Sequence, residues 1–104
     1  MFADTIAAVA TPPGEGSIGI IRLSGSEAVT IASKIVRTRK GIDLRNIRSH
    51  TLYLGKVIDP ETNEDVDEIL ISLMRAPHSY TTENIAEINC HGGPLALAKV
   101  LQLV

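Results

Sequence analysis

The stretch Asn84-Ile-Ala-Glu-Ile-Asn-Cys-His-Gly-Gly-Pro94 decides the fold, because it places a strand, a tight corner and the start of a helix in immediate succession. Side chains on a β-strand alternate between two faces. Proline suits the first position of a helix, where its missing N–H costs no hydrogen bond. We therefore predict a strand over residues 84–91 and a helix from Pro94 onward. One face of the strand carries Ala86, Ile88 and Cys90, and the other carries Glu87, Asn89 and His91.

The rest of the chain supplies four more strands and one more helix. Residues 5–10, 17–23, 49–59 and 66–75 are predicted as strands, since these aliphatic runs are bounded by turn-forming residues. Residues 24–38 are predicted as a helix that begins with a capping box formed by Ser24 and Glu27. Its buried stripe consists of Ala28, Ile31, Ala32 and Ile35. This order predicts an α/β (α+β) fold, a mixed five-stranded sheet with two helices packed on one face.

Two further segments bear on how the chain is organised. Residues 37–48 are basic and are predicted to form a solvated connection. The last predicted helix has an apolar face and reaches the final residue without a stop signal. We expect residues 1–104 to form a single domain whose chain is cut rather than finished.

The charge balance argues against tight nucleic-acid binding by this domain alone. The 104 residues carry a net charge of −2, whereas tight binding of RNA needs clustered cations that release counterions. No apolar run approaches the length of a membrane span, and the N-terminus lacks the features of a signal peptide. Cys90 is the only cysteine, so no intrachain disulfide is expected, which fits a cytoplasmic location.

The run Gly14-Glu-Gly-Ser-Ile-Gly19 matches the spacing of a dinucleotide-binding loop. That loop must open directly into a helix, whereas this run opens into a predicted strand. Its glycines are therefore interpreted as loop glycines. The phosphate-binding G-x-x-x-x-G-K-[ST] motif is absent from the sequence, and the three histidines lack metal-ligand spacing. We expect no metal site and no catalytic residue within this chain.

Arg22 lies in an apolar strand between Ile21 and Leu23. Its guanidinium must therefore reach solvent, a carboxylate of this chain or an anionic ligand. The polar row that begins at Glu87 is either a solvated sheet face or a binding surface. The glycines after His91 favour a binding surface, because they let a ligand approach the backbone, and the helix start beside them favours a negative group. Cys90 is most simply a small buried hydrophobe rather than a reactive thiol.

Five blocks of this sequence, in order and in register, resemble the N-terminal domain of the MnmE/TrmE family of tRNA-modification GTPases. Together they run from residue 4 to residue 94 and so cover nearly the whole chain. Each block alone is a weak signal, but the five in register are specific. The blocks are Asp4-Thr-Ile-Ala7, Ala10-Thr-Pro-Pro-Gly14, Gly19-Ile-Ile-Arg-Leu-Ser-Gly25, Ala76-Pro-His-Ser-Tyr-Thr81 and Glu87-Ile-Asn-Cys-His-Gly-Gly-Pro94.

The resemblance implies a fold like the tetrahydrofolate-binding domain of one-carbon enzymes, and a homodimer formed through this domain. It also implies that Arg22 and Glu87 contact 5-formyltetrahydrofolate or another tetrahydrofolate one-carbon derivative. A carboxylate such as Glu87 suits the N–H edge of a pterin, and Arg22 suits a carboxylate or carbonyl group. Which end of the folate each residue serves stays open.

For the parent protein, the resemblance implies a cytoplasmic GTPase that works with an MnmG/GidA-like flavoprotein. Together they would modify C5 of the wobble uridine of certain tRNAs. GTP, Mg²⁺ and K⁺ would bind in a domain missing from this chain, so the fragment alone is expected to be inactive. tRNA would bind only in the full complex, and no membrane would be involved.

Two other interpretations of the domain are open. It could be a purely structural dimerisation module that holds no ligand. An autonomous enzyme that uses His91 as general base is not supported, because no activated nucleophile or metal set accompanies that histidine.

Overall fold

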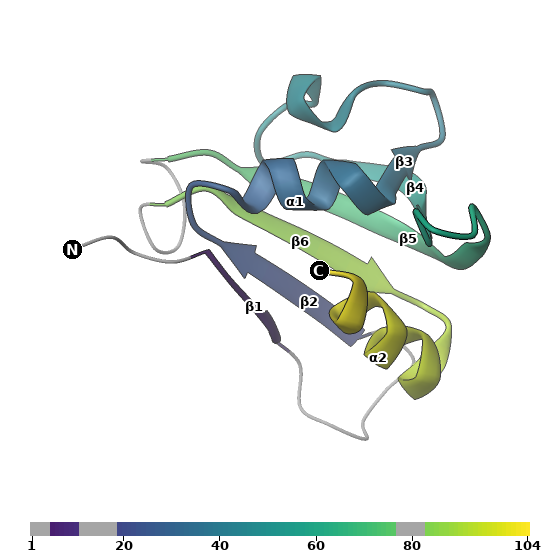
Figure 1. The fold of residues 1–104 in the computed structure, drawn as a ribbon. Coiled ribbons are helices and arrows are strands. Elements are labelled where there is room, and N and C mark those ends of the chain that lie inside the picture. Colours follow the sequence, from purple (N-terminus) through teal and green to yellow (C-terminus); the bar gives the residue numbers. More distant parts are fainter. Residues whose placement is uncertain (1–4, 11–18, 77–82) are drawn as a thin grey trace.

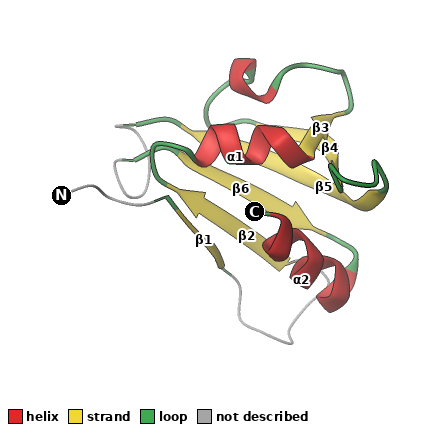
Figure 2. Ribbon diagram, in the orientation of Figure 1, coloured by secondary structure: helices red, strands yellow, loops and turns green. Residues whose placement is uncertain are grey.

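The computed structural model describes residues 5–10, 19–76 and 83–104. They form a sheet with two helices on one of its faces (Figures 1 and 2). The apolar face of the sheet and the inner faces of both helices share one core, which includes Ile21, Ile71, Ile88, Ala32 and Val100. The elements in chain order are β1 Ile6–Val9, β2 Gly19–Ser24, α1 Ala28–Ile35, β3 Val36–Thr38, a 3₁₀ turn η1 Leu44–Asn46, β4 Leu52–Ile58, β5 Asp65–Met74, β6 Ile85–Cys90 and α2 Gly93–Leu103.

Within the described residues, the sheet has six strands in the order β1-β2-β6-β5-β4-β3. Every pair of neighbouring strands is antiparallel. The prediction of a mixed five-stranded sheet is therefore wrong in strand number and in strand direction. The order of the elements along the chain does not reveal that β6 lies between β2 and β5 in the sheet. It also gives no sign of the additional strand β3.

The additional strand, β3, occupies the segment where α1 was predicted to continue to residue 38. Val36 is already extended, with φ −102° and ψ 132°, and β3 pairs with β4 through Val36↔Val57 and Thr38↔Gly55. Gly55 permits this pairing, because a Cβ at that position would lie 2.6 Å from Arg37 O. The β-branched residues Val36 and Thr38 favour a strand once a partner strand is present.

The predicted capping box at the start of α1 is also wrong. The helix begins at Ala28 after Glu27, and no side chain caps it. Ser24 lies in β2, where its Oγ donates to Glu83 Oε2 at 3.1 Å. The Glu27 N–H donates instead to Thr5 Oγ1 at 3.0 Å. The Ser24 hydroxyl, which the local pattern predicted would cap the helix, therefore donates to the carboxylate of Glu83, 59 positions away.

The predicted stripe of α1 is confirmed at Ala28, Ala32 and Ile35, which are buried, while Ile31 is partly buried against the core. The segment predicted as a solvated connection contains η1, whose Leu44 is 3% exposed, and Ile47 after it is equally buried. These two residues close the core beneath α1, so the segment is structural as well as connecting.

The deciding stretch folds as predicted. Ile85–Cys90 form β6, with Ala86, Ile88 and Cys90 on the buried face. Helix α2 begins at Gly93, with Pro94 in its first turn. Of the run 14–19, only Gly19 lies within the described residues, and it begins strand β2 rather than a helix.

Candidate functional site

We call the sheet face away from α1 and α2 the open face. On it, Arg22 of β2 lies directly opposite Glu87 of β6. Arg22 Nε donates to Glu87 Oε2 at 2.7 Å, and Arg22 Nη2 lies 2.6 Å from the same oxygen. The sequence left three partners open for the Arg22 guanidinium: solvent, a carboxylate of this chain or an anionic ligand. In the structure it binds a carboxylate of this chain, that of Glu87. The pair links two strands whose residues are 65 positions apart.

The pair leaves one side of Glu87 available. Both contacts with Arg22 involve Oε2, so Oε1 has no hydrogen-bond partner among the described residues. The Glu87 side chain is 13% exposed and the Arg22 side chain 38% exposed. The site is thus a largely buried carboxylate, held in place by an arginine, with one oxygen free to accept hydrogen bonds.

The other two members of the polar row also lie on the open side. Asn89 Nδ2 donates to Leu70 O at 3.3 Å, across to β5. His91 Nδ1 lies 3.3 Å from Glu68 O. Because a carbonyl only accepts, this contact requires the proton on Nδ1 and leaves Nε2 of a neutral ring as an acceptor.

The corner after β6 holds a negative group that belongs to the chain itself. Asp67 Oδ2 accepts from the His91 N–H at 2.8 Å and from the Gly92 N–H at 3.0 Å. A Cβ at Gly92 would lie 2.9 Å from Asp67 Oδ1. Gly92 therefore lets Asp67 approach, and Asp67 supplies a negative charge at the start of α2, where the helix dipole favours one.

Cys90 is 1% exposed. Burial, with a smaller contribution from the charge of Asp67, raises the pKa of its thiol to about 12. A thiol that stays protonated is a poor nucleophile. The prediction of a small buried hydrophobe is confirmed.

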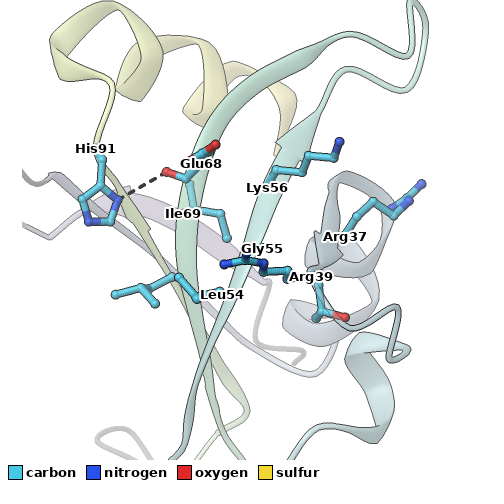
Figure 3. A pocket seen from close by; sticks show the side chains of 10 residues that line it. Arg37, Arg39, Leu54, Gly55, Lys56, Glu68, Ile69 and His91 are labelled. Atoms are coloured by element: carbon cyan, nitrogen blue, oxygen red, sulfur yellow. Dashed lines mark hydrogen bonds between the residues drawn. The ribbon is translucent and has the colours of Figure 1, made fainter.

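A groove with a volume of about 750 Å³ lies on the open face towards the β3 edge. Its walls include Arg39, Lys56, Glu68 and His91, and its floor includes Leu54 and Leu70. Figure 3 shows the Arg39 side chain lying across β4 at Gly55, whereas Arg37 and Lys56 point away from His91. We call this the Arg39 groove.

The family described as "GTP-binding protein TrmE N-terminus" matches residues 5–104. The chain belongs to this family. The resemblance carried by the five sequence blocks is thereby confirmed.

The TrmE N-terminal domain described here has close relatives among curated proteins. It is 64% identical over 104 residues to the tRNA modification GTPase MnmE of Moorella thermoacetica. It is 53% identical over 104 residues to the MnmE of Thermoanaerobacter pseudethanolicus and 55% identical over 101 residues to that of Pediococcus pentosaceus. These matches cover 97–100% of this chain and 21–23% of each relative. The chain thus spans about a fifth of the length of the curated relatives it matches.

Two residues that shape this part of the TrmE N-terminal domain were not identified from the sequence. Asp67 gave no motif signal, because it lies between Asp65 and Glu68 in a short acidic run. Arg39 lay within the basic segment 37–48 and could not be told apart from its neighbours. Among the described residues there is no group of three His, Cys, Asp or Glu side chains that could hold a metal ion. None of the described helices is long and apolar enough to cross a membrane.

Proposed function

We propose that this domain binds a tetrahydrofolate one-carbon derivative, such as 5-formyltetrahydrofolate, through Arg22 and Glu87. The observation that carries the proposal is the Arg22–Glu87 pair, in which Glu87 keeps one carboxylate oxygen unpaired among the described residues. A pterin presents adjacent N–H groups, and a fixed carboxylate is a suitable acceptor for them. When bound, the folate would supply a one-carbon unit.

Arg22 supports this site in two ways. Its charge lies against a mostly buried carboxylate, which would be costly to desolvate without a partner. Its guanidinium also fixes the direction of the Glu87 side chain, so less conformational entropy is lost on binding. The exposed part of Arg22 can still meet a carbonyl or carboxylate of the ligand.

We further propose that the intact protein is a GTPase that modifies C5 of the wobble uridine of tRNA with a flavoprotein partner of the MnmG/GidA kind. The relatives named as tRNA modification GTPases support this proposal, and this chain covers 22% and 23% of the length of the first two. GTP, Mg²⁺ and K⁺ would then bind outside residues 1–104. A cytoplasmic location fits this function.

Homodimerisation is proposed to use the open face. Large apolar side chains remain exposed on it: Ile6 is 62% exposed, Leu52 60% and Leu54 54%. Leu52 and Leu54 lie together on β4, and neighbouring exposed apolar groups are typical of a protein–protein contact. The same observation supports the second candidate function, a purely structural dimerisation module that holds no ligand.

Calorimetric titration of 5-formyltetrahydrofolate into the intact protein tests the folate proposal and separates it from the structural module. We expect Glu87→Gln and Arg22→Ala each to weaken binding about tenfold or more, since each removes a charge-assisted hydrogen bond. Arg45→Ala is the matched control, because Arg45 forms an exposed pair with Asp43 at 2.9 Å. Unchanged affinity in both site variants, with circular dichroism showing native folds, would reject the site, and no folate binding by the unmodified protein would favour the structural module.

A further inference from the structure

The positive charges of this chain are gathered in one segment. Residues 34–48 carry six of the ten Lys and Arg residues but only one of the twelve Asp and Glu residues, Asp43. Because the whole chain has a net charge of −2, the segment is strongly positive and the remainder is negative. All six cationic side chains are exposed. We call this set the cationic rim: Lys34, Arg37, Arg39, Lys40, Arg45 and Arg48.

The cationic rim wraps around the edge of the sheet at β3, the last strand in the order. On the helical side, Lys34 lies in the last turn of α1, and η1 packs against that helix. On the open face, Arg37 and Arg39 line the Arg39 groove. Figure 1 shows α1, β3 and the segment after β3 together at this end of the molecule. The rim thus presents cations on both sides of one edge.

The surface of the rim is hollowed. A second hollow, with a volume of about 330 Å³, has Arg37 and Arg45 in its walls, together with Gly41. Arg37 lines this hollow as well as the Arg39 groove, so the two adjoin. Alternate residues of a strand lie about 7 Å apart on the same face, which is the spacing expected between Arg37 and Arg39. The result is a concave strip with a cation at each step.

Most of this positive charge is not neutralised within the domain. Arg37 donates to two neutral carbonyls, Ser33 O at 3.1 Å and Val36 O at 3.2 Å, and so keeps its full charge. Of the six rim cations, Arg45 alone forms an ion pair within the described part of the chain, with Asp43. Glu68 also lines the Arg39 groove, where it lies opposite Lys56 in the register of β4 and β5.

We propose that the cationic rim binds the phosphate backbone of tRNA in the intact protein, without reading its sequence. Four of the six rim cations are arginines, which bind phosphate through paired N–H···O bonds. Cations spread along a strip suit a chain of regularly repeated anions, and their binding releases counterions from it. The negative remainder of the domain repels a polyanion and so directs it to the β3 edge.

This inference rests on the tRNA-modifying function proposed above, and it assigns a surface of this domain to that substrate. The rim supplies only part of the contacts, because the domain as a whole is negative. It therefore agrees with the expectation that the domain alone does not bind RNA tightly.

Fluorescence anisotropy with an unmodified tRNA transcript tests the rim, using the intact protein with a saturating amount of its flavoprotein partner. We expect Arg39→Gln and Lys40→Gln each to lower the slope of log affinity against log salt concentration by about 1. At about 0.1 M salt this corresponds to about a tenfold loss of affinity, equal for transcripts of different sequence. Lys99→Gln is the matched control for net charge, because Lys99 is an exposed cation on α2, outside the rim, and lies 3.4 Å from Asp59.

The outcomes separate the inference from the function it rests on. If the unmodified protein and its partner neither bind nor modify tRNA, the tRNA-modifying function fails and the inference with it. If they bind tRNA and natively folded rim variants keep the same affinity and salt slope, only the assignment of the rim fails.

Two further results would also overturn the proposal. Loss of flavoprotein binding by the rim variants, with unchanged tRNA affinity at saturation, would assign the rim to an acidic protein surface. Aggregation of the rim variants, with unchanged tRNA affinity, would show that the cations only protect the β3 edge from pairing with other chains.

Discussion

Asp67 organises the corner at which β6 leads into α2. Its Oδ2 accepts the N–H groups of both His91 and Gly92. Backbone N–H groups at a helix start have no partner within the helix, and a carboxylate there also meets the positive end of the helix dipole. One side chain from β5 thus positions His91 beside the Arg39 groove.

We expect Asp67→Ala to lower the free energy of unfolding by about 1–3 kcal/mol, because it removes the charged acceptor of two backbone N–H groups. Urea denaturation followed by circular dichroism measures this change. Asp65→Ala is the matched control two residues earlier: Asp65 forms an exposed pair with Lys56, which is worth about 0–1 kcal/mol. Equal losses in the two variants would contradict the role given to Asp67.

The segment from β3 through η1 shows how an element can depend on contacts outside itself. Its sequence is basic, and its cations are exposed, including Arg37, which donates to Ser33 O, and Arg45, which pairs with Asp43. Yet Leu44 and Ile47 lie in the core, and Val36 and Thr38 pair with β4. Asp43 stabilises the 3₁₀ turn by accepting from the Arg45 N–H at 2.9 Å. The polar composition of the segment thus concealed two anchoring side chains.

Leu44→Ala should lower the free energy of unfolding by about 2–4 kcal/mol, since it leaves a cavity beneath α1. Ile42→Ala, two residues earlier, removes a side chain that is 38% exposed and should cost about 1 kcal/mol or less. Thermal or urea denaturation of the two variants side by side provides the comparison. A similar small loss in both would show that η1 is a surface loop and not part of the core.

At the scale of the whole molecule, both described α-helices lie on the same side of the sheet. The helices α1 and α2 bury the apolar face, as Figure 1 shows, and the open face carries both the Arg22–Glu87 pair and the Arg39 groove. The open face also keeps Ile6, Leu52 and Leu54 exposed. A second copy that covers this face would bury those side chains and shield a ligand there from water.

Sedimentation analysis over a range of protein concentrations tests whether the open face forms the dimer. We expect the unmodified protein to be dimeric and Leu52→Glu to shift it strongly towards monomer, since a buried unpaired charge is costly at an interface. Leu95→Glu serves as the control, because Leu95 is 88% exposed on α2 and belongs to the helical side. A monomer at high concentration, or equal effects of both substitutions, would contradict this dimer.

Much of the fold and part of the site could be predicted from local sequence. The alternation in residues 84–91, the Gly-Gly-Pro corner and the stripe of α1 each act over a few neighbouring residues, so the pattern alone identifies them. The same local pattern identified Arg22 and Glu87 as polar residues that a sheet must accommodate. The capping box failed because Glu83, 59 positions away, competes for the Ser24 hydroxyl.

The sequence by itself determined the α/β class, the two faces of β6, the buried character of Cys90 and the membership in the TrmE N-terminal family. Only the tertiary structure decided that β3 joins the sheet, that Arg22 pairs with Glu87 and that Asp67 occupies the helix start. It alone showed that Arg39 lines a groove together with His91 and Leu70. The physical reason is common to all four: each depends on contacts between segments far apart in the chain, which local propensity does not encode.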